Sequence, residues 1–228
     1  MDKTDMINEL TFLEKIVLLG LDDKGWFSNS EHRIKYAMAG AILFELYMQG
    51  RLVVEENIVR VTNQNSLADP GLNRVLDFIC SGKKQRTLKN WMQRIVMKKL
   101  MIRKTVIKSL IEKKILKKEE YSLLWVMYQF KYPILNTEVK RALQQELYDN
   151  ILNGRKLSDH DLMMVSVMEN CRMVRKNFHG YENYSKLRKL IREIAQFDKV
   201  ENETTKMIEM VHLATSRAII ASNVSIHA

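Results

Sequence analysis

Residues 33–54 read RIKYAMAGAILFELYMQGRLVV, and the pattern changes within this stretch from helix to strand. Up to residue 49 the apolar residues recur every three or four positions, which is typical of one face of a helix. Gly50 stands where a helix end favours a residue that can adopt a positive φ. Two β-branched runs, residues 52–54 and 58–61, then flank a polar Glu-Glu-Asn turn and predict a short β-hairpin. We therefore expect a long helix followed directly by a hairpin.

Helical patterns dominate the rest of the chain. The expected helices cover residues 10–21, 69–81, 87–97, 100–114, 137–152, 159–171, 185–197 and 204–222. A second hairpin is expected over residues 115–132, with its turn at 118–120 and a long apolar run at 123–130. A helix followed by a hairpin thus occurs twice, as a weak internal repeat. The predicted fold class is mainly α, a compact helical domain with one or two short β-hairpins.

The composition is that of one ordinary globular domain. Of the 228 residues, 46% are hydrophobic and 28% are charged, and only 8 Gly and 2 Pro occur, which favours helices and short loops. The first residues lack the basic and then apolar order of a signal peptide. No stretch approaches the ~18 consecutive apolar residues that cross a bilayer. We therefore expect a cytoplasmic setting.

The net charge of +10 is concentrated in one segment. Residues 82–118 hold fourteen basic residues and one acid, Glu112, and carry +13, whereas the other 23 basic and 26 acidic residues carry −3. The basic residues of this segment are Lys83, Lys84, Arg86, Lys89, Arg94, Lys98, Lys99, Arg103, Lys104, Lys108, Lys113, Lys114, Lys117 and Lys118. Like charges gathered in this way repel one another unless an anionic partner neutralises them, so the segment indicates a polyanionic partner. The alternative is a basic helix face that only water covers.

Sequence motifs for catalysis are absent. The chain contains no glycine-rich phosphate loop, no nucleophile elbow and no His pair with zinc-ligand spacing. The one His cluster, Asp159-His160-Asp161, stands at a helix start, where acidic residues are favoured in any case. Cys80 and Cys171 have no partner at metal-ligand spacing and are expected to be buried. We therefore expect no enzymatic activity, catalytic residue, metal, cofactor or small-molecule substrate.

Two acids, Glu14 and Glu45, stand on helices that are otherwise apolar. A buried carboxylate can have a raised pKa and act as an acid. The interpretation that we favour is structural, a carboxylate paired with a neighbouring Arg or with a backbone donor.

Five segments occur in the order and spacing of a known family: LTFLEKIVLLGL at 10–21, AGAILFELYMQGRL at 39–52, DPGL at 69–72, KQRTLKNW at 84–91 and LIEKKIL at 110–116. Together they resemble the Golgi phosphoprotein 3 family, and the chain looks like a bacterial-type member. We expect one such domain over residues 1–228, best matched over 1–135 and continued by C-terminal helices over 136–228. The resemblance implies a mostly helical domain with a hydrophobic β-hairpin that docks on membranes through phosphatidylinositol 4-phosphate. In eukaryotic members it links Golgi membranes to cytoskeletal or enzyme partners.

The resemblance also implies positions for the lipid headgroup. The family's pocket has a Trp, an Arg nine residues later, and an Arg-x-x-Arg pair at the start of the helix before the hairpin. These positions fall on Ser30, Ala39, Leu100 and Arg103, of which only Arg103 carries the family's residue. Another anionic lipid therefore stays open as the ligand.

Nearby side chains offer a substitute headgroup site. Trp26 and Arg33 lie in the segment that supplies the family's Trp and first Arg, and three lysines surround Arg103. We expect these donors to converge on one phosphate group. The predicted headgroup-binding residues are Arg103, Lys99, Lys104, Lys98, Arg33 and Trp26.

A second membrane anchor is predicted in the later hairpin. Leu123, Leu124 and Trp125 are expected to insert shallowly into the bilayer from the hairpin tip, because stable docking takes a second signal besides charge. The alternative is that these residues pack on the core as an inner strand.

We therefore predict a peripheral membrane protein, a membrane-docked adaptor that binds anionic phospholipid headgroups and a protein partner, with a homo-oligomer left open. The alternative is winged-helix-like nucleic-acid binding, since two helix-plus-hairpin units and a +13 segment are also typical of that class. Lipid is favoured because Leu124 and Trp125 lie near a basic segment that holds few Asn or Gln for base contacts.

Overall fold

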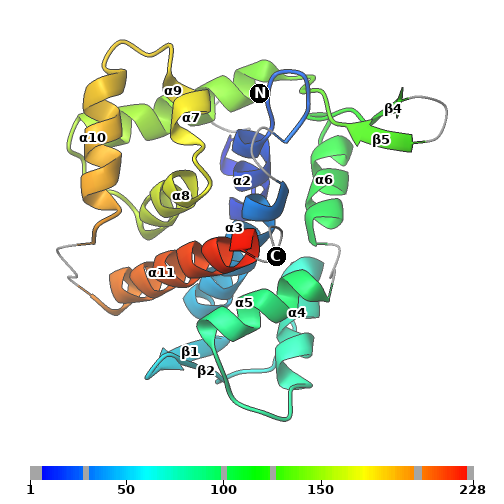
Figure 1. Cartoon of the computed structure of the whole chain (residues 1–228), viewed down its shortest axis with the longest axis vertical. Helices are drawn as coiled ribbons and strands as arrows, with labels where there is room; N and C mark the ends of the chain where they lie inside the picture. The colour runs from blue at the N-terminus through cyan, green and yellow to red at the C-terminus, as the bar shows by residue number, and fades with distance from the viewer. Residues whose placement is uncertain (1–6, 28–30, 99–101, 124–126, 198–201, 225–228) are drawn as a thin grey trace.

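The computed structural model describes residues 7–27, 31–98, 102–123, 127–197 and 202–224, which form a mainly helical fold (Figure 1). The helices are α2 (Phe12–Gly20), α3 (Glu31–Met48), α4 (Pro70–Cys80), α5 (Leu88–Met97), α6 (Ile102–Glu112), α7 (Thr137–Leu152), α8 (Asp159–Asn170), α9 (Val174–Phe178), α10 (Tyr184–Ile194) and α11 (Glu203–Val224). The strands are β1 (Leu52–Glu55), β2 (Ile58–Val61), β3 (Arg86–Thr87), β4 (Glu119–Leu123) and β5 (Met127–Lys131). The predicted fold class is confirmed.

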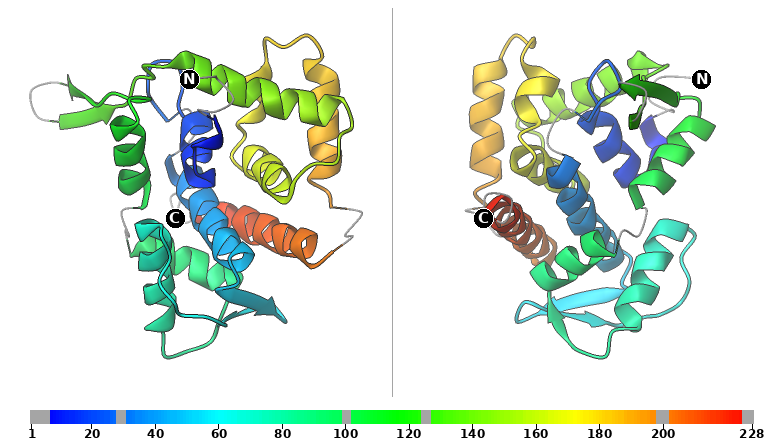
Figure 2. Two further views of the ribbon diagram at one scale, coloured as in Figure 1. Left: turned by 180° about the vertical axis from the view of Figure 1, so that it is seen from behind. Right: turned by 45° about the vertical axis from the view of Figure 1, so that its right-hand side comes forward.

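Helix α3 lies at the centre of the fold. Helices α2, α4, α5 and α8 pack on it, and α11 crosses back to contact α3, α5 and α8 (Figures 1 and 2). Because it is covered on most sides, α3 is apolar around most of its circumference, as expected of a buried helix. One hydrophobic core, with buried residues from Ile7 to Ala214, joins the N-terminal and C-terminal helices.

Gly40 allows α11 to approach α3 closely. A Cβ atom at this position would lie 2.7 Å from Val211 Cγ1 and 3.1 Å from Thr215 Oγ1, both on α11. Any larger residue at position 40 would therefore push the last helix away from the central one. This close packing depends on the missing side chain.

A buried acid joins α2 to α6. Thr11 caps α2, and the Glu14 carboxylate accepts a hydrogen bond from the Thr11 N–H at 2.7 Å. The same carboxylate accepts from Ser109 Oγ and from Lys113 Nζ of the α6 segment, each at 2.7 Å. Only 1% of Glu14 is exposed. The expectation of a paired, structural carboxylate is confirmed, with a Lys in place of the expected Arg.

The first hairpin forms as predicted. Strands β1 and β2 pair antiparallel from Leu52 opposite Val61 to Glu55 opposite Ile58. Their turn residues Glu56 and Asn57 both have positive φ, 48° and 64°, which suits the right-handed twist of a two-residue hairpin. Strand β3 extends this sheet beyond β2. Two residues are too short a run for sequence periodicity to reveal β3.

The second hairpin also forms, but the predicted turn at residues 118–120 is wrong. Strand β4 begins at Glu119, which pairs with Lys131 of β5. A polar run of this kind is typical of a turn, but here it forms the start of a strand. The Glu119 carboxylate lies 2.8 Å from Lys131 Nζ and 3.2 Å from Lys117 Nζ. This hairpin extends away from the helices (Figure 1), so its strands need no alternating apolar face.

Two other details differ from expectation. Cys171 is buried as predicted, but Cys80 is exposed, because it is the last residue of α4 and faces solvent. The short helix α9 falls in a stretch for which no helix was expected. Five residues hold too little periodicity to predict a helix from sequence.

Candidate functional site

The loop between α2 and α3 holds Trp26 against the base of the second hairpin. Asp22 Oδ1 accepts hydrogen bonds from the backbone N–H groups of Lys24 and Trp26, both at 2.9 Å. Gly25 has a φ of 84°, and its carbonyl accepts from the Tyr132 N–H at 2.8 Å. This hydrogen bond therefore joins the loop to the segment that follows β5.

A buried lysine fixes the same loop from α7. Lys140 Nζ donates to the carbonyl of Leu21 at 2.6 Å and lies 3.9 Å from Asp23 Oδ1. Burial lowers the pKa of Lys140, and the nearby Asp23 and Asp22 act against that shift. The loop is thus held by α7 on one side and by the hairpin base on the other.

Arg103 lies over this loop. Its guanidinium carbon is 4.8 Å from the centre of the Phe27 ring, a cation–π distance, and Arg103 is half-buried at the start of α6. The neighbouring Trp26 lines an open cavity of about 630 Å³ together with Lys24, Glu119, Lys131 and Pro133. The structure therefore places Arg103 beside Phe27, the residue that follows Trp26. That these side chains converge on one phosphate group stays a prediction.

Arg33 points elsewhere. Its Nη1 donates to the carbonyl of Asn170 at 3.2 Å, at the C-terminal end of α8. A helix end offers carbonyl groups that lack partners within the helix, and these attract the guanidinium group. Ala39, which occupies the position of the family's first Arg, is 1% exposed within the core.

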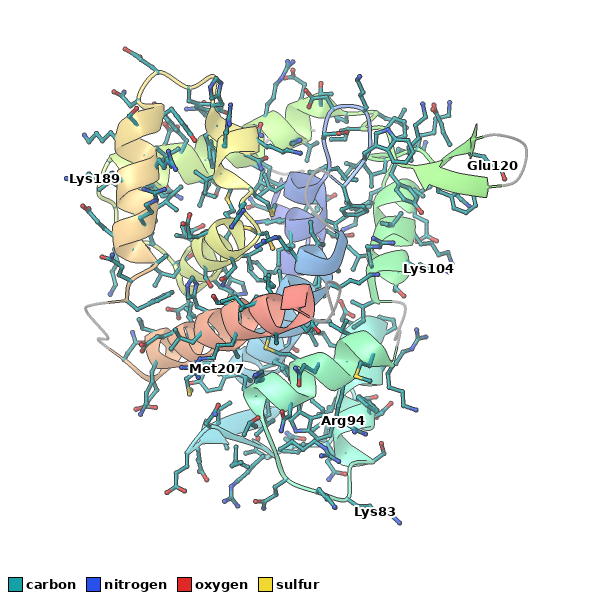
Figure 3. The ribbon with its side chains drawn as sticks, in the orientation of Figure 1. Lys83, Arg94, Lys104, Glu120, Lys189 and Met207 are labelled. Atoms are coloured by element: carbon teal, nitrogen blue, oxygen red, sulfur yellow. The ribbon has the colours of Figure 1, made fainter. Side chains whose placement is uncertain are left out.

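The other predicted headgroup and hairpin residues are described only in part. Lys98 and Lys104 are exposed, and Lys104 points away from the helices (Figure 3). Lys99, Leu124 and Trp125 lie outside the described residues, as do Ser30 and Leu100. Leu123 ends β4, where its backbone pairs with Met127.

Aromatic rings under the basic residues of α5 are a feature that the sequence did not predict. Arg86 lies 5.8 Å from the Trp91 ring centre, and Arg94 lies 5.8 Å from Phe78 and 6.0 Å from Trp91. Lys98 Nζ lies 6.0 Å from the same Phe78 ring. Only the pair Trp91 and Arg94, three residues apart on one helix, gave a signal in the sequence.

Exposed apolar side chains stand beside these cations. Met97 is 77% exposed next to Lys98, and Phe130 is 42% exposed with Lys118 Nζ 3.8 Å from its ring centre. Such a mixture of apolar and cationic groups is typical of surfaces that meet a membrane interface.

The basic segment 82–118 follows one side of the fold, from the turn before β3 through α5 and α6 to the base of the hairpin (Figures 1 and 3). Its described exposed cations are Lys83, Lys84, Arg94, Lys98, Lys104, Lys108, Lys114, Lys117 and Lys118. Within this segment, ion pairs join Lys108 to Glu112, Lys113 to Glu14 and Lys117 to Glu119, among other interactions of its described residues. Within the described part of the chain, the acids of α7 to α11 take no part in these pairs.

A second cavity contains the His cluster. It measures about 410 Å³ and lies between α2, α3, α7 and α8. His160 Nε2 lies 2.7 Å from Glu45 Oε1, and its ring packs edge-on against Phe12 and Phe44, with ring centres 5.2 and 5.5 Å away. Glu45 is therefore paired, but its partner is His160 and not the expected Arg or backbone donor.

This pair predicts a pH dependence of stability. The hydrogen bond to Glu45 raises the pKa of His160 above its ordinary 6.5, although burial opposes the shift. A raised folded-state pKa means that the pair stabilises the fold below pH 6.5 and that this stability is lost as the pH rises through the raised value. We expect His160→Gln to lower the free energy of unfolding by about 1 kcal/mol at acidic pH, after allowance for its exposure, and by far less at alkaline pH.

Urea denaturation of both proteins at acidic and alkaline pH measures this difference. Glu45→Gln should give the same pH profile, because it removes the other half of the pair. An effect of His160→Gln that does not change with pH would contradict the interpretation. Burial lowers the pKa of His212. The contribution of His212 to the stability of the fold is therefore lost as the pH falls, which is opposite to the pH dependence of the His160 pair.

The described residues form neither a metal-binding group nor a membrane-spanning helix. No three His, Cys, Asp or Glu side chains within them are grouped closely enough to hold a metal ion. Of the helices that they form, none has the length and apolar character needed to span a bilayer.

A known protein family matches this chain over the elements that carry the candidate site. The Golgi phosphoprotein 3 (GPP34) family matches residues 13–211, from α2 into α11. Vacuolar protein sorting-associated protein 74 from Eremothecium gossypii is 32% identical over 95 residues, a match that covers 36% of this chain and 28% of that relative. The chain thus matches less than a third of that relative's length. Because the family match includes the loop, the basic segment and both hairpins, the chain belongs to the Golgi phosphoprotein 3 family.

Proposed function

We propose that this protein docks on an anionic membrane through its basic edge, which we define as α5, α6 and residues 113–118. The observation that carries the proposal is the course of segment 82–118, which holds +13 and follows the side of the fold from which the β4–β5 hairpin extends (Figure 1). Charge and an apolar hairpin are the two signals that reversible membrane docking needs. Docking of this kind is peripheral, from the cytoplasmic side.

The energy of this attraction follows from the number of exposed cations. Each Lys or Arg near an anionic leaflet contributes about 1 kcal/mol, so several of them together give useful but reversible attachment. The attraction is screened as salt is raised. The hairpin residues Leu123, Leu124 and Trp125 are the proposed second anchor, supported by the exposed Phe130 of β5.

The headgroup site that we propose centres on Arg103 and the loop that carries Trp26. Support comes from the 4.8 Å contact of Arg103 with Phe27 and from the exposed Lys98 and Lys104 at the adjoining ends of α5 and α6. Arg33 is placed at α8 instead and is not part of this proposal. Family membership favours phosphatidylinositol 4-phosphate as the lipid.

The adaptor role is part of the same proposal. The family name refers to a Golgi phosphoprotein, and the matching relative is named for vacuolar protein sorting. A docked domain that takes part in sorting must also bind a protein. We therefore infer a function in binding rather than in catalysis.

Reversal of three exposed charges tests the docking. We expect Lys98→Glu, Lys104→Glu and Lys114→Glu together to weaken partition onto acidic vesicles by roughly a hundredfold or more, since about 3 kcal/mol of attraction is lost and repulsion is added. The measurement is co-sedimentation with vesicles that contain phosphatidylserine and phosphatidylinositol 4-phosphate, at low and physiological salt. All three side chains are exposed, so the fold should be kept.

A matched control changes the net charge equally on the C-terminal part of the chain. Lys156→Glu, Lys186→Glu and Lys206→Glu together, all exposed, should keep most of the vesicle binding. Equal losses in both triple variants, or equal recovery of the wild type on neutral and acidic vesicles, would sink the proposal. Tighter binding to duplex DNA than to any vesicle would replace it with nucleic-acid binding.

A further inference from the structure

Four arginines line a pocket where α8, α9 and α10 meet, outside the basic edge. The pocket measures about 560 Å³, and its lining residues are Glu169, Arg172, Val174, Arg175, His179, Tyr184, Arg188 and Arg192. Four guanidinium groups and one carboxylate leave three uncompensated positive charges. A pocket of this composition attracts anions that carry several charges.

The arginines reach this pocket from three elements. Tyr184, Arg188 and Arg192 follow one another at four-residue spacing, so they share one face of α10. Arg175 comes from α9, and Arg172 from the turn between α8 and α9. A ligand in the pocket would therefore be surrounded by donors that the tertiary structure has brought together.

Arg172 occupies a backbone position that ordinarily favours glycine. Its φ is 56°, in the left-handed region, directly after the end of α8. The turn is closed by hydrogen bonds from Arg172 N–H to the Glu169 carbonyl at 3.0 Å and from Met173 N–H to the Met168 carbonyl at 2.8 Å. The chain thus has a long cationic side chain at a position where Gly would be less strained.

Among the residues that the structure describes, none of the four guanidinium groups forms an ion pair or a side-chain hydrogen bond. Lys189, also on α10, does have such a partner in Glu193 at 3.7 Å. Gathered like charges destabilise a fold, and an anionic ligand would remove this repulsion.

We propose that the arginine pocket, defined by Arg172, Arg175, Arg188 and Arg192, binds a compact anion with two or more phosphate groups. A guanidinium group binds phosphate oxygens bidentately, and four such groups offer more donors than one phosphate can accept. Tyr184 and His179, whose ring centres lie 5.6 Å apart, add a hydroxyl and a ring nitrogen at the pocket.

Clustered phosphate groups occur on lipid headgroups and on soluble molecules, and the geometry favours the soluble source. Helix α10 lies on the side of the fold opposite α6 and the β4–β5 hairpin (Figures 1 and 2), and Figure 3 shows Lys189 of α10 far from Lys104. A flat bilayer that meets the basic edge does not reach the arginine pocket. Only this choice of source, and not the site itself, rests on the proposed membrane docking.

Isothermal titration with inorganic tripolyphosphate tests the site. The full chain carries Lys98→Gln, Lys104→Gln and Lys114→Gln in this experiment, so that the basic edge contributes little. We expect one saturable site that binds orthophosphate and sulfate at least about tenfold more weakly, because these ions reach fewer of the arginines. Arg188→Gln with Arg192→Gln should weaken tripolyphosphate binding by roughly a hundredfold.

A variant that keeps the positive charges distinguishes bidentate binding by arginine from general electrostatic attraction. Arg188→Lys with Arg192→Lys keeps both charges but loses the bidentate forks, so it should still weaken binding severalfold. All these arginines are exposed, and an unchanged melting temperature without ligand would show that the variants fold. Binding that the lysine variant retains in full would overturn the bidentate site in favour of general attraction.

Three further outcomes overturn the proposal: no saturable binding, equal affinity for tripolyphosphate and sulfate, or binding that Arg188→Gln with Arg192→Gln leaves intact. Vesicle co-sedimentation of this double variant distinguishes the two sources. Retained vesicle binding supports a soluble ligand, whereas its loss would make the pocket a bilayer contact. Failure of the wild type to bind vesicles would leave the tripolyphosphate titration unaffected, so the two proposals fail separately.

Discussion

Lys113→Met is expected to lower the free energy of unfolding by about 3 kcal/mol, because it leaves a buried carboxylate without its cation. Lys113 Nζ lies 2.7 Å from Glu14 Oε2 and also donates to the Glu9 carbonyl at 2.7 Å. The Glu14 side chain is 2% exposed, so water cannot replace the lost partner. Urea denaturation followed by circular dichroism measures the change.

The neighbouring pair on α6 is the control. Lys108 lies 3.4 Å from Glu112 in an exposed pair, so Lys108→Met should change the free energy of unfolding by only about 0.5 kcal/mol. Adding Glu14→Gln to Lys113→Met removes the stranded charge and should recover part of the lost stability. Equal effects of Lys113→Met and Lys108→Met would show that the buried pair does not hold α6 on α2.

Gly25→Ala is expected to be the most harmful small substitution for the candidate headgroup site. The φ of Gly25 is 84°, and an added Cβ would overlap the backbone of Tyr132 and Pro133. Backbone atoms cannot turn aside as a flexible side chain can, so the loop must leave the hairpin base and lose the bond from Tyr132 N–H. We expect a loss of about 3 kcal/mol of stability, from left-handed strain and a lost hydrogen bond.

Gly154→Ala is the control that has the backbone strain of a positive φ without a clash of the added Cβ. Gly154 has a similar positive φ of 61°, but nothing lies within 4 Å of a Cβ placed there. Gly154→Ala should therefore lower the free energy of unfolding by only about 1 kcal/mol, which is the cost of the left-handed backbone conformation alone. Vesicle binding should fall in the Gly25 variant alone, because only there does the loop beside Arg103 move. Two variants of equal stability would mean that the loop and the hairpin base are not coupled.

Most of the helices were predictable because they bury one apolar face, which gives their apolar residues a regular spacing. Helix α5 begins directly after its cap Thr87, and α4 begins at Pro70 after its cap Asp69, as these capping residues predict. The turn of the second hairpin was misplaced for a related reason. A strand that extends from the fold has no face to bury, so its polar start at Glu119 looks like a turn.

For the candidate site, the sequence predicted the positive charge but not the contacts of the charged side chains. The segment 82–118 and Arg103 were found from sequence, but Phe27 under Arg103, Phe78 under Arg94 and the turn of Arg33 toward α8 were not. Each of these contacts joins residues on different elements. In the arginine pocket, Arg188 and Arg192 share one face of α10, but Arg172 and Arg175 come from the turn after α8 and from α9, so no single period joins all four.

The sequence by itself determined the helices other than α9, the presence of two hairpins, the family and the location of the positive charge, since each of these depends on residues close together in the chain. Only the tertiary structure decided which cations share a surface, which acids are buried beside them and which arginines surround a pocket. The physical reason is that periodicity and caps act over one or two turns, whereas electrostatic partners are chosen by distances across the packed core.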